Sequence, residues 1–406
     1  MKEDKKVPQL RFPEFTDAWK QRELGEIAER VTRRNSSLES QTPLTISAEY
    51  GLIDQNKFFG KRIAAKDLSN YYLIQKGEFA YNKSTSNDAP WGAIKRLDCY
   101  NNGALSTLYI VFKIKDNKSC HSDFLVTYYG TSLWHKGVKE IATEGARNHG
   151  LLNVSPSDFF RTKLVIPQDF EEQRKIGAFF TQLDNTITLQ QRKLNSLQKL
   201  KKGLLQKMFP KNGENIPEIR FPEFSDAWKQ RKFSEVFEEY SEKKHPELPA
   251  LTIIQGKGTI LRDASDRNLL YDKANLASYK LVRKDDFIVH LRTFEGGLEK
   301  ANSDGIVSPA YHIFHGKNTD TRFFYPFFRS KYFIDALLKP HVYGIRDGKS
   351  IDIEGMKTIS FLVPSFEEQN KIGKFVETLD NTITLQQRKL ESLQKLKKGL
   401  LQQMFI

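Results

Sequence analysis

The longest regular pattern of apolar positions in this chain covers residues 170–209. Apolar residues recur there at alternating steps of four and three, and Gln190 and Lys201 are the two polar interruptions. The pattern returns at 366–406, with Gln386 and Lys397 as the equivalent interruptions. This spacing is typical of coiled-coil helices, each about 60 Å long. The seam residues are Ile176, Phe180, Leu183, Ile187, Leu194, Leu197, Leu204 and Met208, then Ile372, Val376, Leu379, Ile383, Leu390, Leu393, Leu400 and Met404.

Each apolar seam needs a partner, and the other helix is the obvious one. The symmetry of two similar helices favours an antiparallel pair. The alternative is two separate amphipathic helices, each packed on its own domain. No Asp or Glu occurs from Asn185 to Gly213, although Lys and Arg are frequent there. This basic face could follow DNA phosphates, dock another protein or simply be solvated.

The helices belong to a tandem duplication of the whole chain. LRFPEFTDAWKQR at 10–22 is matched by IRFPEFSDAWKQR at 219–231, and LDNTITLQQRKL at 183–194 is identical to 379–390. The offset between copies falls from 209 residues at the first motif to 196 at the second. The material between the motifs is therefore shorter in the second copy, and it has also diverged much more. This contrast fits a scaffold that is the same in both copies and holds two recognition segments of different sequence.

The divergent interiors, 28–164 and 237–361, have short β-type runs between turns, which is typical of mixed α/β domains. Weak matches survive inside them, such as YYLIQKGEF with YKLVRKDDF and GAR at 145–147 with GIR at 344–346. We expect most of their many aromatic residues, including FFYPFF at 323–328, to form the cores. The predicted fold is α+β, with two globular domains, two long antiparallel helices and pseudo-two-fold symmetry. The predicted boundaries are a first domain at 1–169, a first helix at 170–209, a linker at 210–217, a second domain at 218–365 and a second helix at 366–406.

Composition narrows the choice of partner. The 406 residues carry a net charge of +14, which suits a polyanion, either nucleic acid or an anionic membrane surface. No apolar run approaches the length of a membrane span, and Met1 to Gln9 lacks the apolar core of a signal peptide. Cys99 and Cys120 have no CxxC partners, so we expect neither a zinc site nor a disulfide framework. A cytoplasmic location is the default expectation.

The motifs of the obvious DNA enzymes are missing. The chain contains no Pro-Pro dipeptide, which a methyltransferase acting on base amino groups would need, and no Pro-Asp dipeptide of the usual nuclease site. It has no GxxxxGK[ST] phosphate loop, and the Gly256–Gly258 pair lacks a third glycine at the right spacing. We therefore expect no catalytic residues, no metal and no cofactor in this chain.

Base recognition needs side chains with fixed hydrogen-bond donors and acceptors. Arginine pairs with guanine, and asparagine or glutamine with adenine, so polar loops with interspersed cations are the place to look. Arg147 and Arg346 stand out because each follows the glycine of the matched GAR/GIR loops, where the backbone can approach a duplex closely. The candidate DNA-binding residues are Lys83, Asn87, Lys95, Arg96, Arg147 and Asn148 in the first copy, and His290, Arg292, Lys300, Arg346 and Lys349 in the second.

Two motifs and the duplicated layout resemble the specificity subunit of type I restriction-modification enzymes. The motifs are WKQRELGEI with its echo WKQRKFSEV, and IPQDFEEQRKIGAFFTQLDNTI with its echo VPSFEEQNKIGKFVETLDNTI. A Pro, then Glu-Gln, Ile and Leu-Asp-x-x-Ile mark the start of the long helix in that family. The resemblance covers essentially the whole chain.

The resemblance implies that each variable domain, 1–169 and 218–365, is a target-recognition domain for one half of a bipartite site in double-stranded DNA. It implies that the helices set the spacing and dock two methyltransferase subunits, which bind S-adenosylmethionine. Restriction and translocase subunits, which use ATP and Mg, would join through the complex. Structural and subunit-docking roles fall on Pro167, Glu172, Gln173, Ile176, Leu183, Asp184 and Ile187, and on Pro364, Glu368, Gln369, Ile372, Leu379, Asp380 and Ile383.

Three other hypotheses remain open at this point. The chain could read DNA for another defence or mobile-element system without methyltransferase partners. It could be a coiled-coil adaptor that binds only protein, with no salt-dependent affinity for DNA. It could also be an enzyme with an unrecognised site.

Overall fold

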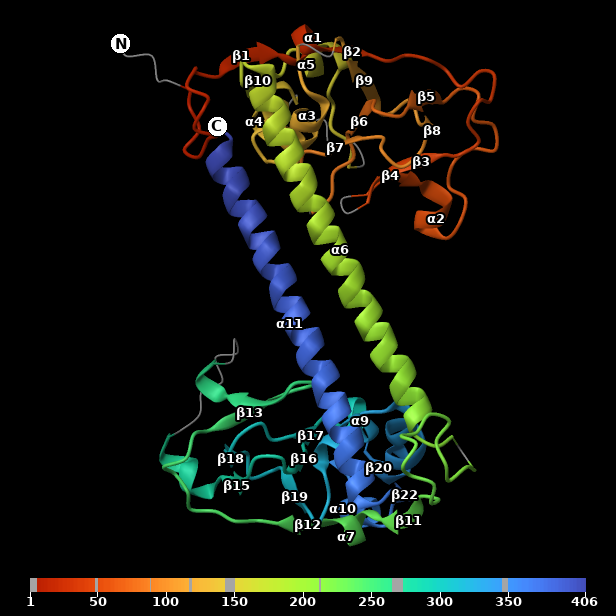
Figure 1. Cartoon of the computed structure of the whole chain (residues 1–406), viewed down its shortest axis with the longest axis vertical. Helices are drawn as coiled ribbons and strands as arrows, with labels where there is room; N and C mark the ends of the chain where they lie inside the picture. The colour runs from red at the N-terminus through yellow and green to blue at the C-terminus, as the bar shows by residue number, and fades with distance from the viewer. Residues whose placement is uncertain are drawn as a thin grey trace. The chain divides into compact units, whose positions relative to one another are not determined.

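The computed structural model describes residues 6–47, 50–87, 89–116, 119–142, 150–211, 213–264, 273–344 and 350–406. The chain forms two compact units (Figure 1). Unit 1 holds Met1–Gln191 and Lys389–Ile406, and unit 2 holds Arg192–Arg388. Both long helices are divided between the units, so each unit contains one end of each helix.

The elements from the start of the chain through the first part of the long helix α6 form unit 1 together with the end of the second long helix. They are β1 (Lys20–Glu23), α1 (Leu24–Ile27), β2 (Ala28–Arg30), β3 (Leu44–Ser47), β4 (Gly51–Asp54), α2 (Gln55–Phe59), β5 (Tyr72–Gln75), β6 (Phe79–Asn82), β7 (Ala93–Arg96), β8 (Asn102–Leu105), β9 (Ile110–Ile114), α3 (Ser122–Tyr129), α4 (Trp134–Ile141), α5 (Pro156–Phe160), β10 (Lys163–Ile166) and α6 (Phe170–Met208).

The elements of unit 2 follow α6 and end with the second long helix, α11. They are β11 (Lys229–Lys232), α7 (Phe233–Val236), β12 (Phe237–Tyr240), β13 (Leu251–Ile254), β14 (Gly258–Leu261), η1 (Arg262–Ala264), η2 (Lys273–Ser278), β15 (Lys280–Val282), β16 (Phe287–Val289), α8 (Thr293–Gly296), β17 (Glu299–Lys300), β18 (Gly305–Val307), β19 (His312–Gly316), α9 (Thr321–Phe328), η3 (Phe333–Leu338), η4 (Lys339–His341), β20 (Val342–Tyr343), β21 (Ser350–Ile351), α10 (Ile353–Lys357), β22 (Ser360–Val363) and α11 (Phe366–Met404).

The two units share one strand order. Unit 1 has an antiparallel four-stranded sheet in the order β2-β9-β6-β7, and unit 2 repeats it as β12-β19-β16-β17. The pairs β5-β8 and β3-β4 recur as β15-β18 and β13-β14. The weak sequence matches lie on these equivalent strands, since YYLIQKGEF contains β5 and YKLVRKDDF contains β15. The predicted mixed α/β architecture, with its internal duplication, is confirmed.

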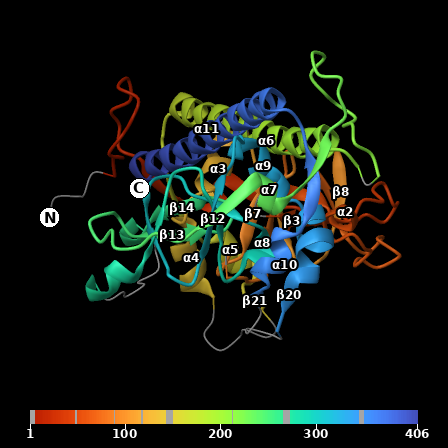
Figure 2. The ribbon, with the colours of Figure 1, turned by 90° about the horizontal axis from the view of Figure 1, so that it is seen from below.

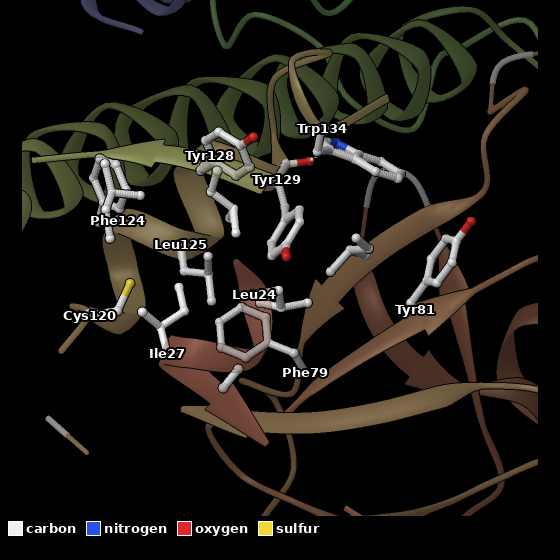
Figure 3. Close-up of a cluster of buried hydrophobic side chains, with 14 of the residues drawn as sticks. Leu24, Ile27, Phe79, Tyr81, Cys120, Phe124, Leu125, Tyr128, Tyr129 and Trp134 are labelled. Atoms are coloured by element: carbon white, nitrogen blue, oxygen red, sulfur yellow. Dashed lines mark hydrogen bonds between the residues drawn. The ribbon is translucent and has the colours of Figure 1, made fainter. Parts of the chain in front are cut away.

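The cores are rich in aromatic residues, as expected. In unit 1 the ring of Phe79 stacks on Phe112 (centroids 5.2 Å apart), and the Trp134 indole N–H donates to the Tyr129 carbonyl (3.2 Å; Figure 3). In unit 2, Phe323, Phe324 and Phe328 of the FFYPFF run are at most 1% exposed. These three side chains belong to the core of unit 2, so they cannot contact a ligand from outside.

The long helices contribute their ends to both cores. Phe405, just beyond α11, stacks on Phe124 of unit 1 at 5.5 Å. In unit 2, Phe209, just beyond α6, stacks on Phe323 at 5.1 Å. Within each unit the ends of the two helices lie side by side (Figures 1 and 2), and a cross-helix ion pair in each unit requires that they run antiparallel. Both helices begin at the predicted residues.

Candidate nucleic-acid interface

A buried ion pair joins the start of each long helix to the opening motif of its repeat. The Glu172 carboxylate, wholly buried, accepts hydrogen bonds from Nε and Nη2 of Arg11 at 2.6 and 2.7 Å. In unit 2 the same two atoms of Arg220 donate to Glu368, both at 2.7 Å. Hydrogen bonding to the carboxylate raises the pKa of each arginine. Bidentate geometry satisfies both charges in a site that excludes water.

The next residue of each helix ties the helix to its domain. Gln173 Nε2 donates to the Pro167 carbonyl (2.9 Å), and its Oε1 accepts from the His121 backbone N–H (2.8 Å) at the start of α3. Gln369 makes the same two bonds, to the Pro364 carbonyl (3.0 Å) and from the N–H of Asp320 (3.1 Å). Each glutamine therefore connects the start of a long helix to the interior of its domain, and the docking role stays a prediction. Glu172, Gln173, Ile176 and their second-copy equivalents are at most 3% exposed, so docking would have to use other residues.

The two lysines that interrupt the seam are paired across the helices. Lys397 of α11 forms an ion pair with Asp184 of α6 in unit 1, and Lys201 of α6 pairs with Asp380 of α11 in unit 2. An acid early in one helix thus meets a lysine late in the other, which is possible only in antiparallel order. Single charged positions of this kind specify register in coiled coils. Leu183, Ile187, Leu379 and Ile383 beside them are half-buried.

Two candidates of the first copy lie beside the predicted reading loop. Lys83 follows β6, and its backbone carbonyl accepts from the N–H of Leu152 (3.0 Å), while the Thr85 N–H donates to the Gly150 carbonyl (2.7 Å). These bonds bring the segment that contains the exposed Asn87 next to the end of the loop that contains Arg147 and Asn148. Those last two residues lie outside the described residues. Burial, and then the charge of Arg30, lower the pKa of Lys83.

The other two first-copy candidates on β7 are engaged within unit 1. Arg96 donates to Asp98 and to Asp123, both at 2.7 Å. Lys95 is partly buried next to the cross-helix ion pair; burial and then the charge of Lys397 lower its pKa, while Asp184 opposes this shift. Arg96 therefore links β7 to α3, Lys95 lies near the helix seam, and contact with DNA stays a prediction for both.

The second-copy candidates also include residues that are engaged or buried within their own unit and one that is exposed. Lys300 of β17 is paired with Asp285, and His290 is largely buried with its pKa lowered to about 4, first by burial and then by the charge of Arg329. Arg292 is exposed. Arg346 and Lys349 lie outside the described residues, so the matched GAR/GIR loops cannot be compared.

The sequence patterns predicted neither the arginine partners of Glu172 and Glu368 nor the aspartate partners of the two seam lysines. A signal for the arginine partners was present, because RFPEF and Glu-Gln both recur in the two copies. The contact could not be predicted, since Arg11 and Glu172 lie 161 positions apart in the chain. The Gly256–Gly258 pair, which lacks the third glycine of a phosphate loop, binds a carboxylate of this chain. Its two N–H groups donate to the buried carboxylate of Glu299, at 2.7 and 3.1 Å.

Neither a metal centre nor a membrane span is found in the part of the chain that the structure describes. No group of three or more His, Cys, Asp or Glu there is arranged to hold a metal ion. No helix among the described residues is both long and apolar enough to cross a bilayer.

Comparison with known proteins identifies the family. Residues 16–199 and 225–395 match the sequence model of the type I restriction modification DNA specificity domain. The chain belongs to the type I restriction-modification specificity subunits. Among curated members, the MjaVIII specificity subunit of Methanocaldococcus jannaschii is 25% identical over 306 residues, which is 70% of each chain.

Solved structures support the fold of this specificity subunit. The crystal structure of the type I restriction-modification system S subunit from M. genitalium has a TM-score of 0.60 and 14% sequence identity, over 98% of this chain and 99% of that one. The family accounts for the two units, since its sequence model matches once in each repeat.

The buried ion pair can be tested in unit 2. Replacing Arg220 by Met leaves the Glu368 carboxylate buried without its cation, so the free energy of unfolding of unit 2 should fall by about 3–5 kcal/mol. Hydrogen exchange of unit 2 peptides in increasing urea measures this loss. As a control, Arg231→Met removes an exposed pair with Glu235 (3.7 Å) and should cost less than about 1 kcal/mol. Equal effects of the two substitutions would contradict a structural role for the buried pair.

Proposed function

We propose that each unit of this specificity subunit reads one half of a bipartite site in double-stranded DNA. The observation that carries the proposal is a shared frame with different chemistry at equivalent positions. By strand register, Lys83 after β6 corresponds to the exposed Leu291 after β16. Two readers of different half-sites need this combination, whereas a protein adaptor gives no reason for it.

Affinity for the duplex backbone would come from the net charge of +14, which makes binding sensitive to salt. The chain contributes recognition and no chemistry of its own. Methylation with S-adenosylmethionine, and translocation with ATP and Mg, would be carried out by partner subunits in the cytoplasm.

The basic flank of the long helices is the place where we propose that methyltransferase subunits dock. Leu189 and Leu200 of α6 lie 11 residues apart, so they share one face of the helix. They are 63% and 51% exposed, and the equivalent Leu385 and Leu396 of α11 are 70% and 52% exposed. Unit 1 contains Leu189 and Leu396, and unit 2 contains the other two, so each unit offers an equivalent site.

These leucines favour a protein over phosphates as the occupant of the basic face. An exposed apolar side chain gains nothing beside a phosphate, whereas burying a leucine contributes about 1.5–3 kcal/mol. Arg192, Lys193 and Lys199 of α6 lie around them, and α6 has no acidic residue after Asp184. The docking partner should therefore be an amphipathic helical surface with acidic residues at its rim.

The proposal that each unit reads one half-site is tested by exchanging the divergent segment of one unit. If residues 28–164 are replaced by the same segment of another specificity subunit, one half of the methylated motif should change and the other half should stay, because unit 2 is untouched. Sequencing of methylated bases in cells measures both halves. A change in both halves, or equal binding of random and cognate duplexes by the unaltered assembly, would refute the proposal.

The docking face is tested by the double variant Leu189→Asn and Leu385→Asn, which places one polar residue in each proposed site. We expect the methyltransferase subunits to be lost from the purified complex while the variant stays folded, because both side chains are already exposed. Leu261→Asn is the matched control, since Leu261 is 52% exposed and lies on β14, not on a long helix. Normal recovery of the complex with the double variant would exclude this face.

The helices would also set the gap between half-sites. One extra heptad after Leu194 and one after Leu390 keep the seam in register and leave both cross-helix ion pairs intact. Each helix grows by about 10 Å, or about three base pairs at about 3.4 Å per base step. Mapping of methylation should show the same half-sites with a longer gap. A heptad in one helix alone should be inactive, and an active double insertion with the original gap would disprove the spacing role.

A further inference from the structure

The segment between β16 and β17 of unit 2 forms a turn that its own hydrogen bonds hold in place. The His290 N–H donates to Thr293 Oγ1 (2.7 Å), and the Arg292 N–H donates to Nδ1 of His290 (3.3 Å). Nδ1 can accept because the imidazole is neutral near pH 7, its pKa being lowered to about 4 by burial and by Arg329. The Gly297 N–H closes the turn on the Thr293 carbonyl (2.8 Å).

Packing fixes the far end of the same turn. A Cβ on Gly296 would lie 1.7 Å from Nε2 of Gln255, and Gly297 has φ +82° with its Cβ position 2.0 Å from the Phe328 carbonyl oxygen. Only glycine fits at the second position without strain. The turn therefore presents its exposed residues in one fixed arrangement.

Two of those exposed residues, Leu291 and Arg292, take no part in the packing of unit 2. Leu291 is 68% exposed, although Thr293, two residues further along the chain, is fully buried. Arg292 is exposed and, among the described residues, has no ion pair or side-chain hydrogen bond. The other arginines described between residues 218 and 365 all have such partners: Arg220, Arg231, Arg262, Arg283, Arg322 and Arg329. A rigid turn that exposes a leucine beside an unpaired guanidinium is suited to binding from outside the chain.

We propose that Leu291 is a specificity-determining residue that contacts the 5-methyl group of a thymine in the half-site read by unit 2, with Arg292 on a neighbouring guanine. The inference rests on the proposed function and deepens it. In the major groove the thymine methyl is the apolar feature of the base edges, and the O6 and N7 atoms of guanine accept two hydrogen bonds from arginine. A leucine and an arginine on consecutive positions match these two features.

The equivalent position of unit 1 supports the assignment of this place to reading. Phe79 pairs with Phe112 as Phe287 pairs with Phe314, which aligns Leu291 with Lys83. A lysine donates hydrogen bonds and cannot recognise a methyl group. The two units thus place different chemistry at the end of the same central strand, as readers of different half-sites would.

The experiment removes one methyl group at a time from the DNA. The full chain, in complex with its methyltransferase subunits, is titrated with duplexes that carry its methylated motif. Each thymine of the unit 2 half-site, on either strand, is replaced in turn by deoxyuridine. We expect the unaltered complex to lose about four- to tenfold in affinity at one of these positions, from the burial of a methyl group. Leu291→Ala should bind the thymine and deoxyuridine duplexes equally at that position.

Matched controls separate this role from others. Leu261→Ala, another exposed leucine of unit 2, should keep the full deoxyuridine effect, and deoxyuridine in the unit 1 half-site should affect Leu291→Ala and the unaltered protein alike. Replacing the neighbouring guanine by 7-deazaguanine should weaken the unaltered complex and leave Arg292→Ala unaffected.

Three results would overturn the inference while leaving two-reader recognition intact. They are indifference of the unaltered complex to deoxyuridine throughout that half-site, a full deoxyuridine effect in Leu291→Ala, and a half-site with no A·T pair. Loss of methyltransferase subunits from Leu291→Ala would instead assign the leucine to a protein contact. Failure of the complex to prefer its motif over random DNA would refute the proposed function itself.

Discussion

The structure depends on a buried carboxylate at the start of each long helix. Glu172 and Glu368 are at most 1% exposed, and a charge in that position is tolerable only with a bidentate cation against it. The cation comes from the opening motif of the same repeat, at the other end of the globular domain in sequence. The first and last segments of each domain are therefore fixed to one another, and the strands between them can vary in sequence as long as the contacts of α3 and α9 with the long helix are kept.

This constraint explains why the two interiors could diverge while their strand order stayed the same. The ladders β1-β10 and β11-β22 close each domain next to the ion pair, through four residue pairs each. Inside this closure, the position that carries Lys95 in one unit carries Glu299 in the other, with entirely different partners. Lys95 approaches the helix seam, whereas Glu299 binds two backbone N–H groups, Tyr325 and Arg329.

The helices and the duplication could be predicted from sequence because their signals are local or repeated. Apolar periodicity places both helices, and the repeated motifs place the two copies. The partners of charged side chains could not be predicted, because tertiary contacts decide them. Arg96 is bound by Asp123 of α3, and Lys300 of β17 is bound by Asp285, which lies just before the neighbouring strand β16. Leu291 could not be chosen from the sequence as a DNA-binding residue, because an apolar residue just after a strand normally belongs to the core.

The contribution of the last residues to the first core has a consequence for biosynthesis. Phe405 packs on Trp19 with ring centroids 5.9 Å apart, and the Leu10 N–H bonds to the Gln403 carbonyl (2.9 Å). Ribosomes add about 5–20 residues per second, so about 20–80 s separate the synthesis of these partners. Unit 2 is available in full before the end of α11 emerges. The unit that is made first must therefore wait with an incomplete core, and it finishes folding after the unit that is made second.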